Sequence, residues 1–158
     1  MDEIEKKSLK SFFLTNKKVL IIFCSIIIII GVFFWWSENS NIRQKYKNSE
    51  DFIGAKVLLS QDNKAKSLEV LKKIIQQNDE VYSPLSLFLI IDRDLEANKK
   101  DVIKYFDQVL SIKSLEKEDR NLLKLKKAIY LSEDAEENDL LNLLNPILNS
   151  NSVWKYQS

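Results

Sequence analysis

Residues 19–36 have the sequence VLIIFCSIIIIIGVFFWW, a stretch of eighteen residues with seven isoleucines and no charged side chain. A helix of this length is about 27 Å long, which is close to the thickness of the hydrocarbon core of a bilayer. A buried helix that is apolar on every side needs a large protein around it, and the rest of this chain is too short to provide one. We therefore predict a transmembrane helix over residues 19–36.

The end of this stretch argues against a cleaved signal peptide. The apolar run leads into large aromatic residues rather than into the small residues that precede a cleavage site. Aromatic rings are typical of the membrane–water interface. Cys24 follows Phe23, where a bacterial lipoprotein carries a small residue, so we interpret it as an apolar side chain. The predicted membrane anchor comprises Val19, Phe23, Ile27, Ile30, Phe34, Trp35 and Trp36.

Basic residues beside the span predict its orientation. Five lysines precede it, and three basic residues follow it closely: Lys6, Lys7, Lys10, Lys17 and Lys18 against Arg43, Lys45 and Lys47. The flank that is richer in Lys and Arg usually stays in the cytoplasm. We expect a single-pass protein of the inner (plasma) membrane, with a cytoplasmic tail over 1–18, the span over 19–36 and a periplasmic domain over 37–158.

The segment after the span predicts helices. Apolar residues recur at helical spacing in three segments, and a longer apolar helix is expected before each of them, over 41–60, 83–97 and 117–132. Ser83 and Pro84 are suited to the N-cap and first position of the second of these helices. A composition of 45% hydrophobic and 30% charged residues, with two glycines and two prolines, also favours an all-α chain. The three stripes are Leu68, Leu71, Ile74 and Ile75; Val102, Ile103, Phe106, Val109 and Leu110; and Leu140, Leu141, Leu144, Ile147 and Leu148.

The three stripes repeat with a nearly constant period. Ile75, Leu110 and Leu148 hold corresponding positions and are separated by 35 and 38 residues. Tetratricopeptide repeats are helix–turn–helix units of about 34 residues. The second helix of such a repeat has a small residue and, four positions later, an aromatic one. The corresponding pairs here are Ser67 with Leu71, Val102 with Phe106 and Leu140 with Leu144, so only Ser67 is small and only Phe106 is aromatic. We predict an array of tetratricopeptide-like helical hairpins, an α-solenoid, with an irregular helical bundle as the alternative.

The C-terminal residues predict an incomplete array. Pro146 removes a backbone donor from the last helix, which should therefore be short or kinked. Val153, Trp154 and Tyr156 are typical of the start of a further first helix. We expect a repeat domain that is truncated at its C-terminus, whose uncapped face would let a partner or a second copy bind.

The inventory of residues excludes several kinds of chemistry. The chain has no histidine, so it lacks a histidine-based nucleophile system and histidine-ligated zinc. Its two glycines cannot form a phosphate-binding loop. With 24 basic residues, only three of them arginine, against 23 acidic ones, the net charge of +1 argues against nucleic-acid binding. We expect no catalytic residue, cofactor or metal. The remaining enzymatic hypothesis is a periplasmic hydrolase that uses the carboxylates at Glu133, Asp134, Glu136, Glu137 and Asp139.

The layout of the chain resembles a known family. The lysine-bearing tail ends in SFFLTNKK, the span closes in Trp-Trp, YSPLSLFLI opens the second hairpin, and LLNLLNPIL is followed by Asn151, Ser152, Val153 and Trp154. This order is similar to that of the ancillary subunits of the SecYEG translocon, single-span proteins with a periplasmic tetratricopeptide-like domain. The resemblance implies binding to the translocon and help in passing secretory proteins to periplasmic chaperones. Members of that family continue with further hairpins, which are missing here.

The predicted function is that of a membrane-anchored module for binding other proteins. Its expected partners are the SecYEG translocon, periplasmic chaperones or secretory clients, with the lipid bilayer around the span. A scaffold for another envelope or cell-division complex is the alternative. First helices line the concave side of tetratricopeptide arrays, so Asp92, Arg93, Lys124 and Lys127 are the candidates for peptide contact.

Overall fold

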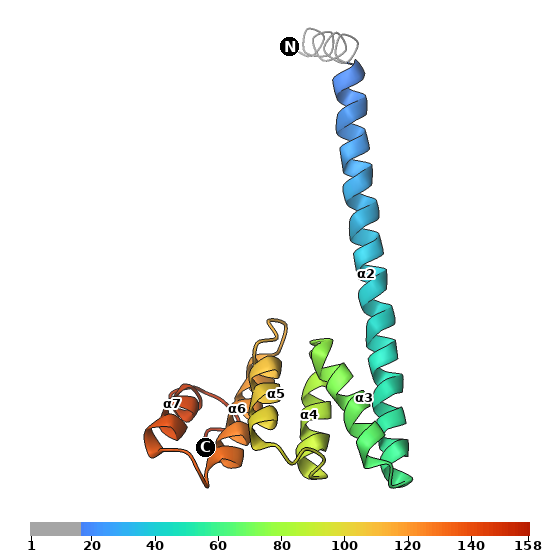
Figure 1. Cartoon of the computed structure of the whole chain (residues 1–158). Coiled ribbons are helices and arrows are strands. Elements are labelled where there is room, and N and C mark those ends of the chain that lie inside the picture. Colours follow the sequence, from blue (N-terminus) through green and yellow to red (C-terminus); the bar gives the residue numbers. More distant parts are fainter. Residues whose placement is uncertain (1–16) are drawn as a thin grey trace. The chain divides into compact units, whose positions relative to one another are not determined.

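The computed structural model describes residues 17–158, and the described residues form helices, turns and loops with no strand. The helices are α2 (Lys17–Ser60), α3 (Lys64–Gln76), α4 (Tyr82–Asp92), α5 (Lys99–Leu110), α6 (Lys117–Leu131) and α7 (Glu137–Leu148) (Figure 1). The predicted all-α class is confirmed.

Helix α2 has 44 residues and contains both the predicted span and the predicted first helix over 41–60. The chain divides into two units, residues 1–44 and 45–158, and each is treated by itself. Most of the predicted cytoplasmic tail, residues 1–16, lies outside the described residues. So do the side chains of the anchor residues Val19, Phe23, Phe34, Trp35 and Trp36, whereas those of Ile27 and Ile30 are exposed. Among the described residues, the structure contains no helix with both the length and the apolar character needed to cross a membrane.

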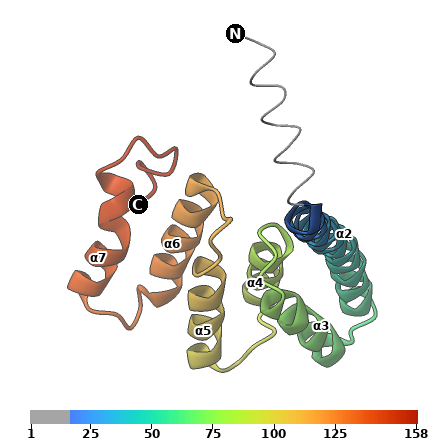
Figure 2. The ribbon, with the colours of Figure 1, turned by 90° about the horizontal axis from the view of Figure 1, so that it is seen from above.

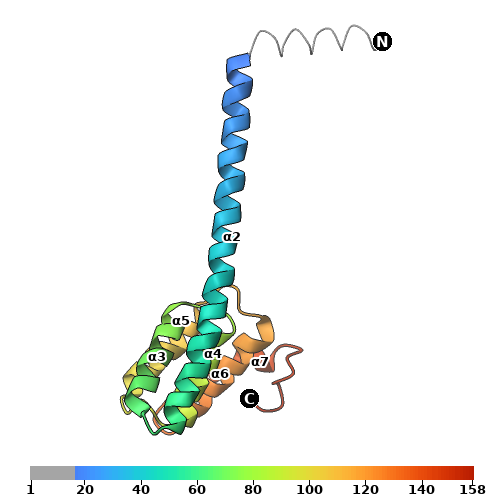
Figure 3. The ribbon, with the colours of Figure 1, turned by 90° about the vertical axis from the view of Figure 1, so that its right-hand side faces the viewer.

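In the unit over 45–158, successive helices from α3 to α7 pack against one another, and α3 also contacts α5. Figures 2 and 3 show α3 and α5 in one layer and α4 and α6 in another. The core between them is apolar and continuous, and it contains Ala55, Leu71, Ile74, Ile75, Leu87, Ile90, Val102, Phe106, Val109, Ile112, Leu115 and Leu123. The first two predicted stripes supply half of this core. In the third stripe, Ile147 is buried but Leu141 is 42% exposed.

Helix α4 differs from its prediction at both ends. It begins at Tyr82, and the cap comes from the Asp79 carboxylate, which accepts hydrogen bonds from the backbone N–H groups of Val81 and Tyr82. Ser83 is therefore not the N-cap; its buried hydroxyl donates to the carbonyl of Ile74. The helix ends at Asp92 rather than at residue 97, because Asp94 has a positive φ of 49° and the Leu95 N–H turns back to the Ile90 carbonyl.

The predicted start of a further helix at Val153 is wrong. Residues 149–158 form turns, and they fold back onto the start of α6. The Ser152 hydroxyl and the Val153 N–H donate to the Glu118 carboxylate, and the Trp154 indole N–H donates to the Glu118 carbonyl. These hydrogen bonds to α6 replace the helical ones that the sequence pattern predicted. Pro146 lies inside α7, which ends two residues beyond it. With 12 residues, α7 is as long as α5, so the predicted shortening of the last helix is not seen.

Substitution of Phe106 tests how much this core contributes to the stability of the fold. Its side chain is fully buried and packs at 5.9 Å from the Tyr130 ring. We expect Phe106→Ala to lower the free energy of unfolding by about 3–5 kcal/mol, because it leaves a cavity between the two layers. The matched control is Ile129→Ala on α6, whose side chain is 59% exposed and whose loss should cost less than about 0.5 kcal/mol. Urea unfolding followed by circular dichroism measures both. Equal losses for the two variants would contradict this assignment of the core.

Candidate functional site

The candidate site is a groove along the exposed face of α4. Its centre is a hollow of about 420 Å³ between residues 45–60 of α2, α4 and α6. Two smaller hollows continue it, one of about 260 Å³ toward Ser60 and one of about 220 Å³ toward Glu80, and each shares lining residues with the central one. The central hollow is lined by Phe52, Lys56, Leu85, Phe88, Leu89, Asp92, Arg93, Leu122 and Lys126.

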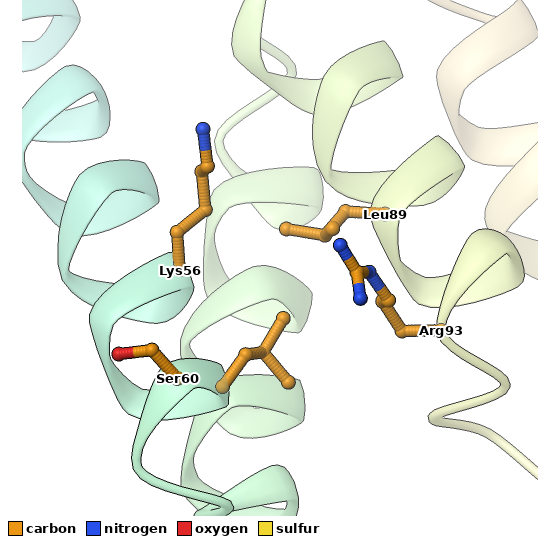
Figure 4. A pocket seen from close by; sticks show the side chains of 5 residues that line it. Lys56, Ser60, Leu89 and Arg93 are labelled. Atoms are coloured by element: carbon orange, nitrogen blue, oxygen red, sulfur yellow. The ribbon is translucent and has the colours of Figure 1, made fainter.

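The three helices that line the groove run in the same direction. At the start of α4, the Phe52 and Tyr82 rings lie 5.9 Å apart. At its end, Ser60 of α2 and Arg93 line the same hollow. Residue numbers therefore rise together along α2 and α4, and Figure 4 shows Lys56 and Ser60 on one side of the pocket and Leu89 and Arg93 on the other.

Helix α6 follows the same course beside α4. Asp119 lines the same hollow as Val81, and the Lys126 ammonium lies 5.9 Å from the centre of the Phe88 ring. The groove is thus bordered by two parallel helices, with a third parallel helix as its floor.

Asp79 fixes the relative position of α2 and α4. One oxygen of its buried carboxylate caps α4, and the other accepts a hydrogen bond of 3.1 Å from the Asn48 amide on α2. Asn78, just before it, has a φ of 54°, and this left-handed turn places Asp79 against both helices. A buried carboxylate needs such partners, because it is costly to bury unsatisfied. The separation between α2 and α4 is thereby held at the N-terminal end of the groove.

The two ends of the groove differ in charge. Lys56 and Arg93 line the hollow toward the C-terminal ends of α2 and α4, and Lys126 lines the central hollow with them. Glu80 and Asp119 line the opposite end. The Lys45 ammonium donates a hydrogen bond of 2.8 Å to Glu80, and this bond is the main reason that the pKa of Glu80 lies below its usual value.

The structure brings together two of the four predicted contact residues. Asp92 and Arg93 line the groove. Lys124 is not among the lining residues, and the Lys127 ammonium pairs with Asp107 of α5. Lys56 and Lys126 line the groove but were not among the candidates. The three groove cations are separated by 37 and 33 residues, which differ from the 35 and 38 residues of the predicted repeat, so alignment on that repeat does not find them.

The acidic run after α6 has a structural use. Asp134 pairs with Lys99 at the start of α5, and the Glu136 and Glu137 backbones begin α7. The residues that the structure describes include no group of three metal-ligating side chains.

Searches of protein-family models, curated proteins and solved structures find no match to this chain.

Acidification should release the C-terminal segment from α6. Hydrogen bonds to the Glu118 carboxylate, first of all from Ser152, hold the pKa of Glu118 below its usual value of 4.5. Their contribution is complete above that usual value and is lost as the pH falls through the lowered one. In a W35F/W36F background, Trp154 fluorescence should therefore change in a transition below about pH 4.5. Glu118→Gln should abolish the transition; an unchanged transition in that variant would contradict the assignment.

Proposed function

We propose that this chain is a membrane-anchored protein-interaction module whose binding surface is the groove along α4. The observation that carries the proposal is the set of three parallel helices with apolar side chains left uncovered between them. Val81 and Leu85 are 51% and 41% exposed in this groove, while the other side of α4 is buried in the core. Concave, mostly apolar surfaces with a few polar groups are typical of binding sites.

A tetratricopeptide-like array accounts for the arrangement of these helices. It would pair α2 with α3, α4 with α5 and α6 with α7. Contacts at the period of the repeat support it, since Lys45 pairs with Glu80 and Lys99 pairs with Asp134, both at a separation of 35 residues. In such arrays the first helices line an extended surface that binds polypeptides.

The proposed anchor is the transmembrane helix over residues 19–36. Its support is the uncharged sequence, which lies within the continuous helix α2. Apolar side chains exposed along this stretch also favour lipid contact, because water-soluble surfaces rarely expose so many in sequence. They are Ile22, Ile26, Ile27, Ile28, Ile29, Ile30 and Val32, each at least 49% exposed. The flanking lysines favour a cytoplasmic N-terminus and a periplasmic domain.

The more specific role that we propose is that of an accessory to the Sec translocon. It rests on the resemblance in the order of tail, span and hairpins. In that role, the groove would receive segments of secreted proteins as they leave the translocon and before periplasmic chaperones bind them. The span would hold the groove close to the point of exit.

Photocrosslinking in intact bacteria tests the module. A photoreactive amino acid at Leu89, inside the groove, should capture secretory polypeptides or translocon subunits from the membrane fraction, identified by mass spectrometry. The same group at Ile129, exposed outside the groove, is the matched control.

The domain should resist alkaline extraction from membranes and be digested by protease only after the outer membrane is opened.

Deleting residues 1–36 should release the domain from the membrane and abolish capture of translocon subunits at Leu89. Equal capture at Leu89 and Ile129 would contradict the groove as the binding surface. Membrane-independent capture of translocon subunits would contradict the role of the span.

A further inference from the structure

The cations of the groove differ from the lysines that join separate segments of this unit. Four lysines pair with a carboxylate of another segment: Lys45 with Glu80, Lys72 with Glu96, Lys99 with Asp134 and Lys127 with Asp107. In the described part of the chain, Lys56, Arg93 and Lys126 form no salt bridge. The three cations therefore keep their charge available to a ligand.

These three cations line one hollow although they come from three separate parts of the chain. Lys56 is on α2, Arg93 directly follows α4 and Lys126 is on α6, yet all line the central hollow. Asp92 is the single acidic residue among the side chains that line this hollow, so its charge excess is positive. Like charges held close together repel one another, and an anionic group between them would remove that cost.

Apolar surface lies immediately beside the cations. Phe88, Leu89 and Leu122 line the same hollow and are half-buried. From there the apolar lining continues past Leu85 and Pro84 to Val81. The groove follows the length of α4, which is roughly 16 Å for its helical residues, enough for about five residues of extended peptide.

We propose that the groove selects extended peptide segments in which acidic side chains adjoin apolar ones. The ligand's carboxylates would lie among Lys56, Arg93 and Lys126, and its apolar side chains would cover Phe88, Leu89 and Leu85. At the other end Lys45 pairs with Glu80, and Asp119 disfavours a second acidic group there, so the charge also sets the direction of the peptide. This inference rests on the proposed function and adds the chemistry of the partner.

Binding of defined peptides to the full chain in lipid nanodiscs tests the inference. The probes are three fluorescent peptides, EELSLSL, KKLSLSL and EESSSSS, and fluorescence anisotropy gives their affinities. We expect EELSLSL to bind roughly tenfold more tightly than either of the others, because they lose the charge attraction or the apolar contact. Raising the ionic strength from about 0.05 M to about 0.5 M should weaken its binding.

Charge reversal in the groove provides the matched comparison. The double variant R93E/K126E should weaken EELSLSL roughly tenfold and strengthen KKLSLSL. The control K66E/K100E carries the same change in net charge on exposed residues of α3 and α5 and should leave both affinities unchanged. Circular dichroism checks that each variant keeps its helices. If R93E/K126E does not fold, R93Q/K126Q should still weaken EELSLSL about threefold.

The results separate this inference from the proposed function. Equal binding of EELSLSL and KKLSLSL, or no effect of R93E/K126E, would overturn the charge selectivity while capture at Leu89 could still support a binding groove. If no peptide binds and Leu89 crosslinks join two copies of this chain, a second copy fills the groove and the inference is overturned. Absence of both binding and capture would overturn the inference and the proposed function together.

Discussion

The buried carboxylate of Asp79 is the constraint on which the groove depends. It caps α4 and accepts the amide hydrogen bond of Asn48 on α2, so it positions two helices with one side chain. Small polar residues assist it from α3 and α4: the Ser67 hydroxyl donates to the Ala55 carbonyl, and the Ser83 hydroxyl donates to the Ile74 carbonyl. These residues satisfy buried polar groups while letting the helices approach closely. The apolar core stabilises the stack, and this polar network fixes its geometry.

Charge has two separate uses in this unit. Between the helices, pairs such as Lys45 with Glu80 and Lys127 with Asp107 join elements that are distant in sequence. Arg120 of α6 joins neighbouring elements, because its guanidinium donates to the carbonyls of Leu110, the last residue of α5, and of Ile112, which follows that helix. In the groove, by contrast, the cations face solvent beside apolar side chains. This division is the basis of our proposal that the groove binds a ligand.

The sequence was informative where a pattern spans several turns. Helical spacing located α3 and α5 and their buried residues, since Leu71, Ile74, Phe106 and Val109 recur on one face. Helical spacing failed to predict the ends of helices, because a single contact determines where a helix begins or ends. The α4 cap depends on Asp79, three residues before the helix begins, and the fate of Trp154 depends on Glu118, far away in the chain. At the groove, Arg93 was predictable from its position at the end of a first helix. Lys126 and Lys127 are adjacent in the sequence, but Lys126 lines the groove and Lys127 pairs with Asp107. Only the way in which α6 packs distinguishes these two lysines.

The geometry of the groove can be measured by pulsed electron paramagnetic resonance. Spin labels at Lys56→Cys and Arg93→Cys, in a Cys24→Ala background, report the distance between α2 and the end of α4 in the full chain. A preformed groove held by Asp79 predicts a single narrow distance distribution that broadens when Asp79 is changed to alanine. A broad distribution in the chain with Asp79 intact, or one that Asp79→Ala leaves unchanged, would contradict a groove built on this carboxylate.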